Sequence, residues 1–192
     1  MSGPRVLVTA ASRHGSTAEI ADVLAAEIGG CPAGRAAGVQ ATAVPITARP
    51  DPARYDAVVL GSAVYAGRWL PPAHDLSVHA VAALRQRPVW LFSSGPIGQP
   101  PFPPDEPHDV ATLSTLFTPR DCRVFPGRID VDRLAFPERA LVRAMRAPVG
   151  DFRDWPAVRA WAGEIAAALA GGPAAGADGS LPGAVGAGGA GS

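Results

Sequence analysis

The chain has 192 residues, which suits one domain with a well-filled core. Its 17 acidic and 17 basic residues cancel, and every basic residue is arginine, so no excess of positive charge indicates a nucleic-acid partner. The two cysteines form no CxxC pair, we expect no signal peptide, and no apolar run approaches the roughly 20 residues of a membrane span, so we expect a cytoplasmic protein.

The first informative stretch is VLVTAASRHGST, at residues 6–17. An apolar run breaks into small and polar residues and passes directly into helical periodicity, which predicts a strand, a tight turn and a helix start. Such a turn places backbone N–H groups at the positive end of a helix dipole, beside the hydroxyls of Ser12, Ser16 and Thr17. It suits a phosphate, but taken alone it favours an ordinary helix start, with Ser16 as the cap and Glu19 completing a capping box, because this pattern is common.

What this turn lacks excludes several kinds of phosphate chemistry. An ATP or GTP loop ends in Gly-Lys-Ser/Thr, and the chain has no lysine. A dinucleotide turn reads GxGxxG, whereas only Gly15 is present here. Cys31 and Cys122 lie outside the turn, so neither can accept a phosphoryl group there. A site for a terminal phosphate monoester remains, without a catalytic side chain of its own.

The next part of the chain alternates helices and strands. We expect, in order, a helix at 16–29, a small-residue connection at 31–38, a strand near 39–44, a proline-marked loop at 45–52, a buried strand at 55–60, a loop at 61–69, a helix at 72–86, a buried strand at 88–92 and a loop at 93–98. Polar or glycine-bearing loops thus follow three strands. In a parallel sheet they share the edge where ligands bind.

The proline-rich residues 99–108 form either a lid over the ligand or a surface excursion pinned by Phe102. A short helix at 109–117 and a fifth strand at 122–129 follow, and we interpret Cys122 as a small buried residue. Residues 130–147 predict a basic amphipathic helix. It either lies on an anionic membrane surface or packs on the domain with its arginines in water.

Asp154 caps a last helix whose apolar side chains repeat at core spacing, so Trp155 and Trp161 are interpreted as structural. From Gly171 onward the chain is mostly glycine and alanine, which cannot offset the entropy of ordering. We therefore expect a domain at 1–170 and a disordered tail at 171–192. The remaining histidines show no metal-ligand spacing, and we expect no metal.

Three of these stretches resemble the flavodoxins. TAASRHGST at residues 9–17 resembles their FMN-phosphate loop, YDAVVLGSAVYAG at 55–67 their third strand and first flavin-ring loop, and FSSGP at 92–96 their second ring loop. The later DCRVFPGRI at 121–129 and the start of the last helix are most similar to the flavodoxin-domain branch that contains menaquinone-dependent protoporphyrinogen oxidase. The resemblance covers residues 5–170.

This resemblance implies an α/β fold with a doubly wound, five-stranded parallel sheet, helices on both faces, and FMN as cofactor. It implies stacking on the flavin by Tyr65 rather than Trp69, a phosphate contact or solvation for Arg13, and close backbone approach or a plain turn at Gly61 and Gly95. The implied FMN site comprises Ser12, Arg13, His14, Gly15, Ser16, Thr17, Ser62, Ala63, Val64, Tyr65, Ser93, Ser94, Gly95 and Gly98.

The resemblance also implies an oxidoreductase in which the flavin, and no side chain, carries the chemistry. Electrons pass from an organic donor to a quinone-like acceptor, as in a protoporphyrinogen-oxidase-like enzyme, and a peripheral contact with the inner face of the membrane stays open. The alternatives are a flavodoxin-type electron carrier without its own substrate and a binding module without flavin. Electron-carrier flavodoxins are acidic around the ring, whereas this chain is neutral and has Arg68 there, which favours the enzyme.

Overall fold

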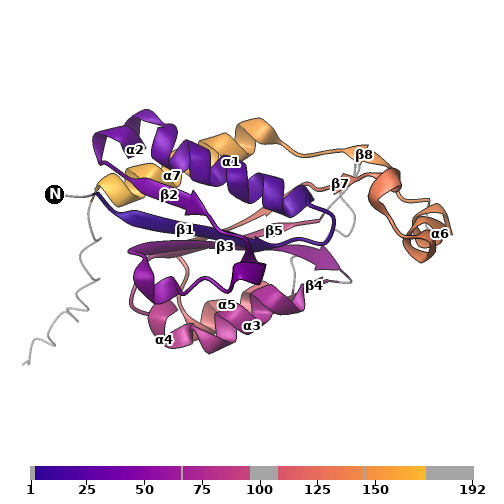
Figure 1. The fold of residues 1–192 in the computed structure, drawn as a ribbon, viewed down its shortest axis with the longest axis horizontal. Helices are drawn as coiled ribbons and strands as arrows, with labels where there is room; N and C mark the ends of the chain where they lie inside the picture. Colours follow the sequence, from indigo (N-terminus) through magenta and orange to yellow (C-terminus); the bar gives the residue numbers. More distant parts are fainter. Residues whose placement is uncertain (1–2, 66, 96–107, 145, 172–192) are drawn as a thin grey trace, which may run out of the picture.

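The apolar runs form the centre of a parallel sheet in the order β2-β1-β3-β5-β6 (Figure 1). The computed structural model describes residues 3–65, 67–95, 108–144 and 146–171. Its five parallel strands are β1 (Arg5–Ala11), β2 (Gln40–Ala43), β3 (Ala57–Tyr65), β5 (Val89–Ser94) and β6 (Asp121–Phe125). The expected doubly wound, five-stranded parallel sheet is therefore confirmed.

Helices cover both faces of this sheet (Figure 1). One face carries α1 (Ser16–Gly30) and α7 (Trp155–Ala170), and the other carries α3 (Pro71–His79), α4 (Val81–Leu84) and α5 (His108–Leu116). Successive strand residues point to opposite faces, so Val6 and Val8 pack in the cluster under α1 and α7, and Leu7 packs in the other. The central strands therefore contain consecutive buried residues.

Two strands run further than the sequence predicts. The residues at 61–65, expected in a loop, continue β3, and Ser93 and Ser94 belong to β5. Ser62 pairs with Ala11 on one side and with Ser93 on the other, so neighbouring backbones satisfy the hydrogen bonds of these small residues. Beyond Tyr65 the chain turns back into the short antiparallel strand β4 (Arg68–Trp69).

Other boundaries also differ from the expectation. The expected helix at 72–86 is broken at Ala80 into α3 and α4, and the connection at 31–38 contains α2 (Pro32–Ala36), which the Cys31 thiol caps by accepting from the backbone N–H of Gly34. The single-turn helices η1 (Ile46–Ala48) and η2 (Pro52–Arg54) lie in the loop after β2.

The prediction of one strand at 122–129 is wrong. β6 ends at Phe125, before Pro126 and Gly127, because proline cannot donate to a strand ladder. Arg128 and Ile129 instead form β7 (Arg128–Ile129), which pairs antiparallel with β8 (Gly150–Asp151) outside the main sheet. Between β7 and β8, the expected long helix is split into η3 (Val131–Arg133) and α6 (Phe136–Ala144).

The last helix agrees with its prediction. The carboxylate of Asp154 accepts a hydrogen bond from the backbone N–H of Ala157 at 2.9 Å and caps α7. Trp161 is buried, and its indole N–H donates to Asp121 Oδ2 at 2.8 Å, joining α7 to β6. Both tryptophans of this helix pack with the core cluster, as expected.

Two expectations fall largely outside the described residues: the proline-rich segment at 99–107, with Phe102, and the tail at 172–192. In the part of the chain that the structure describes, no helix is long and apolar enough to span a bilayer.

Candidate functional site

The turn between β1 and α1 lies at the carboxyl edge of the sheet. Gly15 takes a left-handed conformation, with φ of +86°, and occupies the N-cap position of α1. Because L side chains rarely adopt this conformation, glycine suits this position. No side chain caps the helix, so the capping-box interpretation of Ser16 and Glu19 is wrong. The Ser16 hydroxyl is buried without a hydrogen-bond partner among the described residues.

A cavity of about 160 Å³ opens beside this turn. Segments that are distant in the sequence form its wall: the turn after β1, the carboxyl ends of β3 and β5, and the start of β7. The predicted residues that line it are Ser12, Arg13, His14, Ser16, Thr17, Ala63, Val64, Tyr65, Ser94 and Gly95. Gly127, Arg128 and Ile129 line it as well, and the sequence did not indicate them.

Ser62 and Ser93 are absent from the cavity lining. The Ser62 hydroxyl accepts from the backbone N–H of Leu70 at 2.9 Å and donates to the carbonyl of Ala63 at 2.8 Å. The Ser93 hydroxyl accepts from the indole N–H of Trp69 at 2.9 Å. These two hydroxyls therefore hold β4 against the sheet. Gly15 shapes the turn without lining the cavity, and Gly98 lies outside the described residues.

The two glycines expected near the flavin have different surroundings. A Cβ on Gly61 would come within 2.2 Å of the Phe92 ring, so glycine here makes room for a core side chain. A Cβ on Gly95 would lie 3.1 Å from the Val64 Cβ, at the cavity wall. Only Gly95 of this pair borders the cavity.

Tyr65 and Trp69 also differ in their exposure. Tyr65 is 40% exposed and lines the cavity, with the Arg13 guanidinium 5.6 Å from the centre of its ring. Partial burial raises the pKa of Tyr65, against the lowering effect of Arg13, so the phenol keeps its proton at neutral pH. Trp69 is buried and covers the sheet edge. Tyr65 is therefore the aromatic side chain of this pair that a ligand in the cavity can reach.

Glu19, in the first turn of α1, anchors the β7–β8 hairpin beside the turn. Its two oxygens accept hydrogen bonds from Arg128 at 3.0 and 3.2 Å, and Arg153 donates to Oε2 at 2.6 Å. Partial burial alone would raise the pKa of Glu19, but the hydrogen bonds and charges of Arg153 and Arg128 lower it overall. Arg128 is thereby held at the cavity wall.

Glu138, on α6, contacts the turn between β1 and α1. Its Oε1 lies 3.2 Å from Arg13 Nε and 3.3 Å from His14 Nε2, while its Oε2 accepts from the backbone N–H of Ala135 at 2.9 Å. This backbone hydrogen bond is the main cause that lowers the pKa of Glu138, and the charges of His14 and Arg13 lower it further. The carboxylate is thus ionised at neutral pH.

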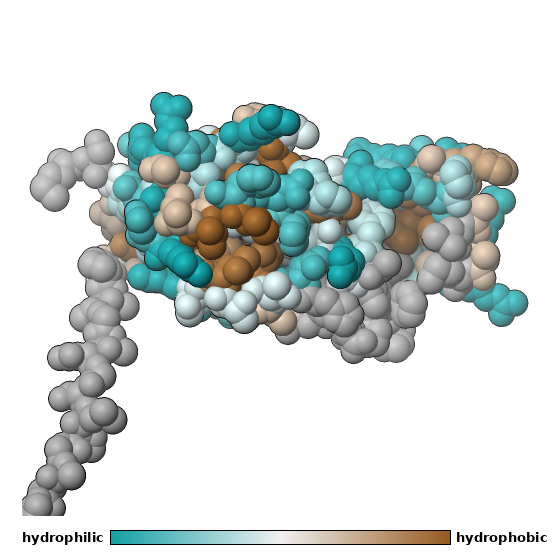
Figure 2. Space-filling model, turned by 90° about the horizontal axis from the view of Figure 1, so that it is seen from below, coloured by the Kyte–Doolittle hydropathy of each residue, from teal (hydrophilic) through white to brown (hydrophobic). Residues whose placement is uncertain are grey.

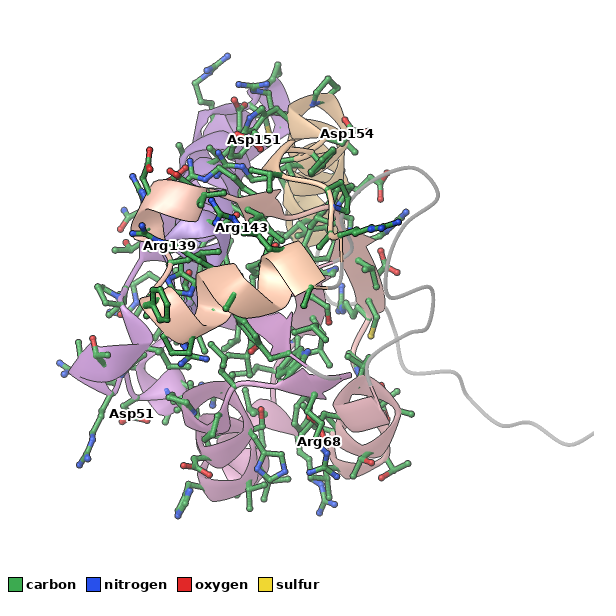
Figure 3. All side chains as sticks on the ribbon, turned by 90° about the vertical axis from the view of Figure 1, so that its right-hand side faces the viewer. Asp51, Arg68, Arg139, Arg143, Asp151 and Asp154 are labelled. Carbon is green, nitrogen blue, oxygen red and sulfur yellow. The ribbon has the colours of Figure 1, made fainter. Side chains whose placement is uncertain are left out.

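α6 lies beyond the carboxyl ends of the strands, at the end of the molecule that faces the viewer in Figure 3. Arg139 and Arg143 on this helix are exposed, and Phe136 is 85% exposed. One of the two expected arrangements of this helix has its apolar side packed on the domain. Phe136 does not pack in this way, because its side chain is exposed to solvent.

A larger cavity of about 630 Å³ lies between η1 and α3, lined in part by Ile46, Arg49 and Leu76. Figure 2 views the face that carries α3 and α4, where hydrophobic residues gather in a patch with hydrophilic ones around it. This cavity contains none of the predicted site residues.

The described residues include no group of three or more metal-ligating side chains that could hold an ion.

The groups that line the cavity beside the turn have the chemistry that suits an anion. It combines a helix N-terminus, the hydroxyls of Ser16 and Thr17, and the cationic side chains of Arg13 and Arg128. The remaining wall, at the ends of β3 and β5, is formed by small and apolar residues and the Tyr65 ring. This division suits a ligand with an anionic end and an aromatic end. The sequence missed Arg128, Arg153 and Glu138 because more than 100 residues separate them from their partners.

A flavodoxin-domain family model matches residues 7–154 of the chain. Among solved structures, a flavodoxin from the domain Archaea is similar with a TM-score of 0.58 and 13% identity, covering 86% of this chain and 98% of that one. A Streptococcus pneumoniae flavodoxin gives a TM-score of 0.54 and 17% identity, covering 85% and 98%. No curated protein matches the chain.

Rubredoxin:oxygen oxidoreductase from Desulfovibrio gigas is also similar, with a TM-score of 0.55 and 18% identity. The match covers 91% of this chain but only 38% of that protein. At these identities the structural matches show a shared fold.

Proposed function

Because the chain belongs to the flavodoxin-domain family, whose cofactor is FMN, we propose that it is an FMN-dependent oxidoreductase with its flavin in the cavity beside Ser16. Ser12, Arg13, His14, Ser16 and Thr17 would hold the phosphate, with Gly15 shaping their turn. Ala63, Val64, Tyr65, Ser94 and Gly95 would hold the ring.

The observation that carries this proposal is the unpaired hydroxyl of Ser16. A buried hydroxyl without a partner costs about 1–3 kcal/mol, and a phosphate oxygen would remove that cost. Ser16 is also the first residue of α1, where the helix dipole favours negative charge. These two observations support a role for the hydroxyl as a donor to an anion rather than as a helix cap.

The protein's own residues would bind and orient the cofactor. Arg13 and Arg128 supply positive charge on two sides of the cavity, and Tyr65 supplies an aromatic face for stacking. When bound, FMN supplies the redox chemistry, because its ring system accepts electrons or a hydride.

Within this class we favour an enzyme that passes electrons from an organic donor to a quinone-like acceptor, similar to the protoporphyrinogen-oxidase branch. Arg13 borders the cavity beside Tyr65, and Arg68 pairs with Tyr65 in the β3–β4 hairpin, where an electron carrier has acidic groups. The exposed Phe136 and arginines of α6 support a peripheral membrane contact near the site. The alternative is a flavodoxin-type carrier without its own substrate.

The absorption spectrum of the purified protein, with FMN added if it is colourless, tests the cofactor. Replacing Ser16 and Thr17 together by Ala should weaken FMN binding by up to a few kcal/mol, since a hydrogen bond to a charged group contributes about 1.5–3 kcal/mol. Ser77→Ala, which removes a buried hydroxyl from α3, is the matched control. Unchanged affinity in the double variant would remove those hydroxyls from the site.

Turnover separates the two redox roles. An enzyme of the proposed class should oxidise protoporphyrinogen with menaquinone as acceptor. Rapid one-electron exchange with a reductase, without turnover of any such donor, would instead support the carrier.

A further inference from the structure

The positive charges around the turn are already matched by carboxylates of the protein. Arg128 and Arg153 pair with Glu19 and Asp151, and Arg133 pairs with Asp130 at 3.4 Å while donating to the carbonyl of His14. Arg13 and His14 pair with Glu138. A phosphate that enters this cavity therefore competes with a resident carboxylate.

Glu138 is the carboxylate that can leave most easily. Glu19 is held by three guanidiniums, and one of them, Arg153, is only 4% exposed. Glu138 instead contacts the single atoms Arg13 Nε and His14 Nε2, and the Arg13 side chain is 56% exposed. Water screens the Arg13–Glu138 pair from the Arg13 side, whereas the Glu138 and His14 side chains are only 21% and 22% exposed, so the pair is weaker than a fully buried one. The other Glu138 oxygen bonds to the backbone of its own segment, at Ala135.

The cavity beside the turn is small for a cofactor site. Its volume of about 160 Å³ is below the roughly 300–1,000 Å³ of typical small-molecule sites. Two of its lining residues, Arg13 and His14, are the partners of Glu138, so α6 is tied to the wall of the cavity. Release of these two side chains frees the Arg13 guanidinium and the His14 ring and removes the ties that Glu138 makes between α6 and the turn.

We propose that Glu138 is a specificity-determining residue, which occupies Arg13 and His14 until an anionic ligand displaces it and releases α6. This role rests on the proposed flavin site, and the feature of the ligand that Glu138 would select is the phosphate. A flavin that carries a phosphate can displace the carboxylate, whereas riboflavin cannot. Because the anion and the Glu138 carboxylate compete for Arg13 and His14, loss of the Glu138 charge should strengthen anion binding.

Glu138→Gln tests this, because it removes the charge and keeps the size of the side chain, and its one remaining oxygen can still accept from the backbone N–H of Ala135. Asp132→Asn is the matched control, since it removes an exposed carboxylate from the same segment. In fluorescence titrations, Glu138→Gln should bind FMN about two- to fivefold more tightly than the wild type or the control. Its riboflavin affinity should not change. Equal FMN affinity in Glu138→Gln and Asp132→Asn would overturn the proposal.

Trypsin cleavage after Arg139 and Arg143, identified by mass spectrometry, reports the release of α6 without depending on FMN. Cleavage there should be several-fold faster in Glu138→Gln than in Asp132→Asn without ligand, and inorganic phosphate or FMN should accelerate it in the wild type. Identical cleavage rates under all these conditions would refute the displacement of Glu138. If no variant takes up FMN, the flavin function fails, and the phosphate and trypsin experiment still decides the role of Glu138.

Discussion

Arg153 donates a hydrogen bond to Glu19 at 2.6 Å across 134 residues of sequence. The same guanidinium binds Asp151 and lies 4.5 Å from the centre of the Trp155 ring. This contact joins the first turn of α1 to the β7–β8 hairpin, on which Arg128 is carried into the cavity wall.

Glu19→Gln should lower the free energy of unfolding by about 1–2 kcal/mol, because it leaves the buried Arg153 less compensated, while the partial exposure of Glu19 limits the loss. Glu27→Gln on the same helix, whose partner Arg159 is exposed, should cost less than about 1 kcal/mol. Urea unfolding of both variants measures the difference. An equal loss of unfolding free energy in the two variants would show that the Glu19 contacts stabilise the fold no more than the exposed Glu27–Arg159 pair does.

The same contacts predict acid sensitivity. The hydrogen bond from Arg153 holds the pKa of Asp151 below its ordinary value of 3.8, and Arg153 and Arg128 hold that of Glu19 below 4.5. A depressed carboxylate pKa stabilises the folded state above the ordinary value, and this contribution is lost as the pH falls through the folded-state pKa. Unfolding free energies measured from pH 6 downward should fall below about pH 4.5, less steeply in Asp151→Asn. A wild-type loss no larger than that of the variant would contradict this.

Gly15→Ala should destabilise the protein by about 1–2 kcal/mol, because the backbone there is left-handed and the new Cβ would lie 3.2 Å from an Arg133 nitrogen. Gly163→Ala lies inside α7 with nothing within 4 Å of the new Cβ, and should stabilise by about 0.5–1 kcal/mol. Thermal unfolding of the two variants should therefore shift in opposite directions. Gly15→Ala should also weaken FMN binding, whereas Gly163→Ala should not.

Ser93→Ala should cost about 1–3 kcal/mol of stability, since it leaves the buried indole N–H of Trp69 without its acceptor. Combining it with Trp69→Phe should cost less than the sum of the two single changes, because the pair acts together. FMN affinity, measured in parallel, tests the other interpretation of this serine. A loss of affinity with unchanged stability would place the hydroxyl on the cofactor.

The first part of the site could be predicted from the sequence because its residues are contiguous. The strand, turn and helix at residues 6–17 follow from local periodicity, and so does the cap of α7 by Asp154. The continuation of β3 through Gly61 could not be predicted, because small residues resemble a loop unless the neighbouring strands are known.

The roles of the Ser62 and Ser93 side chains also could not be predicted from the sequence. Alternation along a strand places both side chains on the face that carries Trp69. This orientation cannot be predicted when both residues are expected in loops. Arg128 and Glu138 gave no local signal, since their partners Glu19 and Arg13 lie more than 100 residues away. Only the folded chain brings these charges together.

The long separation between Glu19 and Arg153 also bears on the order of events during synthesis. A nascent chain that has emerged only through its fifth parallel strand lacks the guanidiniums of Arg128, Arg133 and Arg153, which pair with Glu19. The first turn of α1 therefore reaches its final ion pairing only after the ribosome has added residue 153.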